Sequence, residues 1–311
     1  MLRGAYSHIN PFNKFILLLV LVLSFLLFSV MFGILALVPF YGKGILSILT
    51  SSDFSDTSVV AAMKVIQIFN TAGGLLLPAV IYLWLCTSVD SKSDIYKSVA
   101  PLIILAAIIL IIVGQPVVGF TNEMNSHLNL PKWLSGVENW MKDAEQKNGV
   151  VTEAFLSTTS YGGLMVNILM IAILPAIAEE ILFRGALARL FKDWTKNVHL
   201  AIFISSFIFA AIHMQFYGFL PRFLLGTVLG YLFFWSGSLW LPVVAHFTNN
   251  FLSVMVEFLF RRGYIHTNAE NFGTDNAAWL TVISIVSITG LLYYIRRSGV
   301  TSDDSLSNIH Q

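Results

Sequence analysis

The residues of this chain that could do chemistry begin with two adjacent glutamates inside an apolar segment. Glu179 and Glu180 stand in the stretch PAIAEEILFRGAL, and Arg184 follows Glu180 by four residues. A glutamate four residues before an arginine lies on the same helix face, in the favourable order for an ion pair. We therefore expect Glu180 to pair with Arg184. Glu179, about 100° round the helix, is left as an unpaired carboxylate directed towards the bundle interior.

Two histidines and an asparagine occupy the next apolar segments. His213 follows Phe209 by four residues in FIFAAIHMQF, and His246 precedes Asn250 by four residues in LPVVAHFTNNFL. The second spacing puts an imidazole and a carboxamide on one helix face. A buried carboxylate beside an imidazole can activate water and then protonate a leaving amine, while side-chain donors stabilise a developing oxyanion. Together these types predict a hydrolytic site.

Each of these residues also has a purely structural interpretation. A Glu–Arg pair inside a span can hold helices together, and Asn250 can bridge two helices. A single histidine in a span is more often a hydrogen-bonded packing residue than a catalyst, and Phe209 is more naturally a packing residue under either interpretation. The occurrence of acids and histidines on three apolar segments of a chain poor in charge favours a catalytic role over a structural one.

The composition places these residues in a membrane. Of 311 residues, 11% are charged and 56% are hydrophobic, whereas soluble proteins carry about 25% charged residues. This excludes a disordered chain, a collagen-like fibre and an ordinary cytosolic enzyme. A net charge of +1 also argues against nucleic-acid binding. The single cysteine, Cys86, excludes an intramolecular disulfide and a cysteine-based zinc cluster.

The elements that must position the polar residues are membrane-spanning helices. A span needs about 20 largely apolar residues, and the apolar segments are too long and too uniform for barrel strands. The sequence predicts an all-α polytopic membrane protein, a bundle of about eight transmembrane helices. The expected spans are residues 15–40, 61–86, 99–120, 164–191, 198–214, 219–235, 239–260 and 277–295. The first is too long for a signal peptide and is expected to be retained.

The expected organisation follows these spans. It comprises an N-terminal tail (1–14), helices one to three (15–120), a polar segment (121–160), a core of helices four to seven (161–260), a loop with helix eight (261–297) and a disordered tail (298–311). A small excess of Lys and Arg on the side of the N-terminus predicts that both termini are cytoplasmic.

The polar segment contains one amphipathic pattern. Trp133, Val137 and Trp140 fall on one helix face, with Pro131 suited to the first turn and Gly149 to a C-terminal stop. Two tryptophans on one face predict a helix lying at the membrane interface. A small extramembrane helix packed on the bundle is the equal alternative.

The three spaced motifs together resemble a known family. They are similar to the EExxxR, FxxxH and HxxxN/D motifs of the CPBP (ABI) intramembrane endopeptidases, which include the type II CAAX prenyl proteases. The matching region covers about residues 164–255, a third of the chain. The resemblance implies that Glu179 activates water with the help of His213. It also implies that His246 and Asn250 form the oxyanion site, and that the second acid and the arginine of the first motif orient the others.

The resemblance favours a metal-free glutamic protease, so no cofactor is expected. The alternative is a zinc site made of Glu179, His213 and His246, because two histidines and a glutamate can mimic a zinc triad. A helix with the HExxH pattern is absent from the sequence.

The predicted function is therefore an intramembrane endopeptidase acting on a membrane-associated, prenylated or leader peptide, in a bacterial cytoplasmic membrane. The expected partners are that peptide or protein substrate and the lipid bilayer. The alternative is a non-proteolytic bacteriocin-immunity or scaffold protein whose polar cluster is structural. A proton-coupled transporter is disfavoured, because the sequence shows neither repeated halves nor paired broken helices. The sequence predicts no oligomeric state.

Overall fold

A computed structural model describes residues 2–51, 53–88, 95–127, 130–267 and 278–300, and in these ranges every regular element is helical. In chain order, with η marking 3-10 and π segments, the elements are α1 (Pro11–Tyr41), η1 (Gly42–Gly44), α2 (Ile45–Thr50), α3 (Thr57–Phe69), η2 (Asn70–Leu76), α4 (Leu77–Cys86), α5 (Pro101–Val113), α6 (Gln115–Ser126), η3 (Lys132–Leu134), α7 (Ser135–Leu156), α8 (Tyr161–Asn167), η4 (Ile168–Ile173), α9 (Leu174–Glu180), η5 (Ile181–Ala188), α10 (Arg189–Thr195), α11 (Val198–Ile212), η6 (Phe216–Gly218), α12 (Phe219–Ser236), α13 (Trp240–Arg261) and α14 (Ala278–Val300).

Six helical runs of the described chain are long and apolar enough to cross a membrane, which makes this a multi-pass membrane protein. They are Pro11–Thr50, Thr57–Cys86, Tyr161–Thr195, Phe216–Ser236, Trp240–Arg261 and Trp279–Ser298. A seventh is added if α5 and α6, bent by 41°, form one span. The element expected as the fifth span is α11, whose 15 residues extend about 22 Å against a hydrocarbon core of about 30 Å. The all-α membrane fold is confirmed, and the count of eight stays a prediction.

Both chain ends differ from the expected boundaries. Helix α1 begins at Pro11 rather than at residue 15, because the Asn10 side chain caps it by accepting from the Asn13 amide at 2.8 Å and proline suits the first helical position. Helix α14 continues through Val300, so residues 298–300 are helical and not part of a disordered tail. The rest of the expected tail, 301–311, lies outside the described residues.

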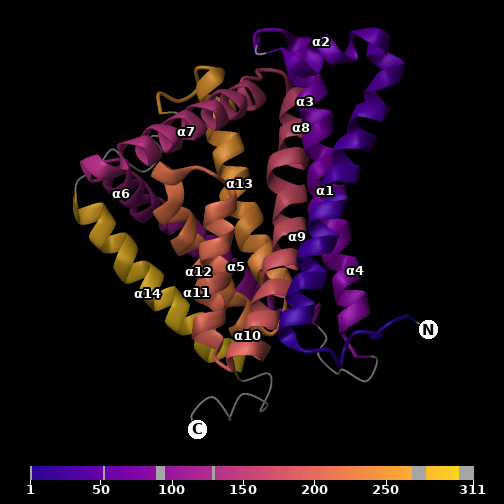
Figure 1. The fold of residues 1–311 in the computed structure, drawn as a ribbon. Helices are drawn as coiled ribbons and strands as arrows, with labels where there is room; N and C mark the ends of the chain where they lie inside the picture. The colour runs from indigo at the N-terminus through magenta and orange to yellow at the C-terminus, as the bar shows by residue number, and fades with distance from the viewer. Residues whose placement is uncertain (1, 52, 89–94, 128–129, 268–277, 301–311) are drawn as a thin grey trace.

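The amphipathic helix of the polar segment is longer than predicted. Helix α7 runs through Gly149 to Leu156, so the expected stop at Gly149 is wrong. A glycine inside a helix costs only about 1 kcal/mol, and the extra turns bring the buried Phe155 onto the bundle. Figure 1 shows α7 lying across the end of the bundle opposite to the end where α1 begins and α14 finishes.

Helix α11, which carries the second motif, packs tightly against α12. Gly226 and Gly230 form a small-xxx-small pair on α12, and a Cβ at Gly230 would lie 2.8 Å from Ile202 Cγ2 of α11. Lipid is as apolar as the side chains, so close van der Waals packing of this kind is what holds helices together in a membrane.

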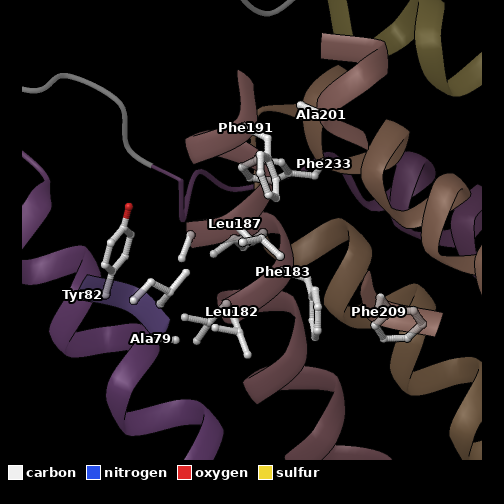
Figure 2. Packing of buried hydrophobic residues seen from close by; sticks show 13 residues of the cluster. Ala79, Tyr82, Leu182, Phe183, Leu187, Phe191, Ala201, Phe209 and Phe233 are labelled. Carbon is white, nitrogen blue, oxygen red and sulfur yellow. The ribbon is translucent and has the colours of Figure 1, made fainter. Parts of the chain in front are cut away.

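A cluster of large apolar residues supports the helix that carries the glutamates. Leu182, Phe183 and Leu187 of η5 lie at its centre, between Tyr82 of α4 and Phe209 of α11. Figure 2 shows the rings of Phe183 and Phe209 next to each other, and their centroids are 5.2 Å apart in an edge-to-face arrangement. The apolar residues within the first motif and directly after it are therefore packed between α4 and α11.

Candidate active site

Glu180 is the centre of a fully buried polar cluster. Its Oε1 accepts a hydrogen bond from Arg184 Nη1 at 2.7 Å and lies 2.8 Å from His246 Nδ1. Both charged residues are almost inaccessible, at 0% and 1% exposure. The predicted Glu180–Arg184 ion pair is confirmed. The contact with His246, which joins α9 to α13, was not predicted, because it depends on how two distant helices pack.

Arg184 has two further contacts. Its Nη2 donates to the carbonyl oxygen of Gly226 on α12 at 2.8 Å, and its guanidinium lies 5.0 Å from the centroid of the Phe209 ring. A buried charge is tolerated when it is both paired and hydrogen-bonded. Arg184 thus ties together the helices that carry the first and second motifs, and sequence reasoning missed the Gly226 carbonyl as its acceptor.

His246 lies between the two glutamates. Its Nδ1 contacts Glu180, and its Nε2 is 3.8 Å from Glu179 Oε2. The Glu180 oxygen that contacts Nδ1 also accepts from Arg184, so a hydrogen bond at this contact is donated by His246 Nδ1. Nε2 then faces Glu179, as an acceptor when the ring is neutral and as a donor when the ring is charged.

Glu179 differs from Glu180 in its access to the surroundings. Its side chain is 13% exposed, whereas that of Glu180 is 0% exposed. The second oxygen of Glu180, Oε2, is buried and has no hydrogen-bond partner among the described residues. Glu179 is therefore the more accessible carboxylate of the pair.

His213 stands at the C-terminal end of α11 with its ring fixed on one side. Its Nδ1 is 2.7 Å from the carbonyl oxygen of Phe209. A carbonyl only accepts, so Nδ1 carries the proton and Nε2 is the basic nitrogen. Within the described part of the chain, neither a hydrogen bond nor an ion pair joins His213 to Glu179 directly.

Phe209 separates the two imidazoles. It is 2% exposed, and its ring centroid lies 5.0 Å from that of His213 and 5.8 Å from that of His246, edge to face in both cases. This position supports its interpretation as a packing residue, one that sets the spacing of the two histidines.

Asn250 is placed near the glutamate helix, but its donor is engaged. Its Nδ2 donates to the carbonyl of Ile171 in η4 at 3.1 Å, and its Oδ1 accepts from Asn249 at 3.3 Å. An oxyanion would have to compete with the Ile171 carbonyl for this donor.

The described residues include no group of three His, Cys, Asp or Glu side chains arranged to hold a metal ion. Glu179, His213 and His246 are accordingly not grouped to hold a zinc ion in this arrangement.

Comparison with known proteins bears on the same region. Residues 161–252 match the family model described as "Type II CAAX prenyl endopeptidase Rce1-like". The uncharacterized protein YpbD of Bacillus subtilis (strain 168) is 34% identical over 85 residues, which cover 26% of this chain and 40% of YpbD. The search of solved structures found no match. All three motifs lie inside the matched segment, so the predicted resemblance is confirmed there.

Proposed function

Since residues 161–252 are a segment of the type II CAAX prenyl endopeptidase kind, we propose that this membrane protein is an intramembrane endopeptidase with Glu179 as its general base. The observation that carries the proposal is the unequal placement of the two glutamates. Glu180 is buried and bound to Arg184 and His246, whereas Glu179 is partly accessible and faces His246 Nε2. Glu180 is held by structural contacts, and Glu179 remains available for the reaction.

The reaction needs one proton acceptor and one proton donor. Glu179 takes a proton from water, and the resulting hydroxide attacks the carbonyl carbon of the substrate peptide bond. The tetrahedral intermediate then breaks its C–N bond, and the leaving nitrogen takes a proton from Glu179 directly or through His213 Nε2. The products are a carboxylic acid and an amine, which become a carboxylate and an ammonium group when the acid passes its proton to the amine, and Glu179 returns to its ionised form.

Charge on the intermediate falls on one oxygen. His246 Nε2 can donate to this oxyanion when its ring is charged, and the buried Glu180 beneath its Nδ1 favours that orientation. Asn250 Nδ2 can contribute the second donor once it exchanges the Ile171 carbonyl for the oxyanion. A single oxyanion donor contributes a factor of about 10²–10³ to the rate in other hydrolases.

The proposed substrate is a membrane-associated, prenylated or leader peptide, and the proposed location is a bacterial cytoplasmic membrane with both termini inside. The second candidate is a non-proteolytic immunity or scaffold protein. It is favoured by the structural partners that Glu180, Arg184 and Asn250 already have.

The test compares the membrane proteomes of cells that carry the parent protein, the Glu179→Gln variant or no protein. Glu179→Gln keeps the size of the side chain and removes the base, so the same uncleaved peptides should accumulate as in cells without the protein. The variant must reach the parent's level in the membrane. Normal cleavage by Glu179→Gln would refute the assignment of the base, and identical proteomes for all three strains would favour the structural alternative.

A further inference from the structure

We propose that α7 positions the catalytic His213, with Asn148 and Glu145 as the positioning residues. This inference rests on the proposed function, in which His213 moves a proton. The amphipathic helix that the sequence places in the polar segment then has a role in the reaction, although it carries none of the three motifs.

The turn after His213 has an unusual backbone. Helix α11 ends at Ile212, and the next residues make a tight turn before η6 and α12. Met214 has a φ of 53°, in the left-handed region that non-glycine residues rarely adopt. Such a conformation persists only where surrounding contacts hold it.

Asn148 of α7 supplies the first of these contacts. Its Nδ2 lies 3.4 Å from the carbonyl oxygen of His213 and 3.3 Å from that of Met214. The last carbonyl groups of a helix have no partner within the helix and need one from elsewhere. Asn148 therefore closes the end of α11 at the residue whose ring enters the site.

Glu145, one turn earlier on α7, supplies the second contact. Its Oε2 accepts from the backbone amide of Tyr217 at 3.2 Å. Phe216, which lies in the chain between Met214 and Tyr217, packs against the ring of Trp140 of α7 with a centroid distance of 5.1 Å. Three successive turns of α7 thus contact the segment from His213 to Tyr217.

Helix α7 is itself fixed at its other end. Glu153 forms an ion pair with Arg261 of α13 at 3.1 Å. The carbonyl of Phe155 accepts from the buried Asn167 of α8 at 2.8 Å, and Asn167 in turn accepts from Lys64 of α3 at 2.8 Å. A helix held at one end by α3, α8 and α13 can serve as a rigid support for the turn at its other contacts.

Among the described residues, the His213 ring makes one hydrogen bond, to Phe209 in the preceding turn. Movement of the turn would therefore shift Nε2 relative to Glu179, and a misplacement of about 1 Å can cost a factor of about 10² in rate.

The test measures the stability of the turn after His213 and the rate of the proposed reaction separately. Hydrogen–deuterium exchange of the full-length protein in nanodiscs reports on the Tyr217 amide and needs no substrate. Turnover is measured by pulse-chase in cells, as the rate at which the peptides that accumulate in Glu179→Gln membranes disappear. The variants are Asn148→Ala, Glu145→Ala and Glu145→Gln. Gln146→Ala is the matched control, because Gln146 is exposed on the same helix.

We expect Glu145→Ala to speed exchange at Tyr217 roughly tenfold, the effect of losing one hydrogen bond to a charged acceptor. Glu145→Gln retains an oxygen acceptor and should recover most of the protection and most of the turnover. Asn148→Ala should lower turnover about tenfold or more through the displaced ring, with unchanged protein level, and Gln146→Ala should match the parent in both measurements.

The outcomes separate this inference from the proposed function. If Glu145→Ala leaves Tyr217 exchange unchanged, or Asn148→Ala turns over peptides like Gln146→Ala while Glu179→Gln stays inactive, the positioning role is wrong and the peptidase stands. If no strain accumulates any peptide, the proposed function is wrong. Exchange at Tyr217 then still decides whether α7 holds the turn.

Discussion

Replacing Arg184 by alanine tests whether the buried ion pair holds the site together. The change removes the bond to Glu180 at 2.7 Å, the bond to the Gly226 carbonyl at 2.8 Å and the contact with the Phe209 ring. It leaves the Glu180 carboxylate buried without its counter-charge. Breaking a buried pair in this way costs about 3–5 kcal/mol, a large part of the about 5–15 kcal/mol by which a folded protein is stable.

The assay is reversible denaturant unfolding in mixed micelles, with the free energy of unfolding compared between variants. Lys147→Ala, on the exposed face of α7, is the control and should change it by less than about 0.5 kcal/mol. The decisive comparison is the double variant Glu180→Gln with Arg184→Met. It removes the uncompensated charge and keeps an oxygen acceptor for His246, so it should be more stable than Arg184→Ala alone.

Two results would refute this reasoning. A cost below about 1 kcal/mol for Arg184→Ala would mean that the carboxylate is not left as a buried charge. A double variant less stable than the single one would mean that removing the carboxylate charge brings no gain, so that Glu180 is not left as an uncompensated charge when Arg184 is absent.

Two shorter predictions concern packing and metal. Gly230→Ala should lower the free energy of unfolding by about 1–3 kcal/mol, since its Cβ meets Ile202 at 2.8 Å and overpacking strains the helix contact; a thermal melt at or above that of the parent would contradict it. Chelation should leave peptide turnover unchanged, and elemental analysis of the purified protein should find less than stoichiometric zinc. Zinc at one equivalent that leaves together with activity would overturn the metal-free proposal.

The sequence predicts those parts of the site that depend on spacing within one helix. The Glu180–Arg184 pair is such a case, because i, i+4 neighbours meet on any regular helix. The contact of His246 with Glu180 and the bond from Asn250 to Ile171 join separate helices. Their partners depend on helix rotation and packing, about which the spacing of residues inside each segment carries no information.

The helix ends show the same difference between local signals, which the sequence predicts, and tertiary contacts, which it does not. Asn10 and Pro11 mark the start of α1 through local capping chemistry, so this helix start is encoded in the adjacent residues. Gly149 carries an equally local stop signal, yet α7 continues because its last turns pack on the bundle through Phe155. A signal worth about 1 kcal/mol is overridden by tertiary contacts.

In the proposed reaction, the π-helical segments determine which of the two glutamate side chains is placed to act as the base. Helix α9, which ends with both glutamates, lies between η4 and η5, and both of these are wound as π-helix. A π turn holds about one residue more than an α turn, and one residue of α-helix corresponds to about 100° of rotation. Rewinding η4 as α-helix with all of its residues kept would turn the helix beyond it by roughly that angle relative to α8. Glu179 and Glu180 are chemically equal and differ by the same angle. The different roles proposed for the two glutamates therefore depend on the rotation of α9 about its axis, which the π-helical segment η4 before it sets.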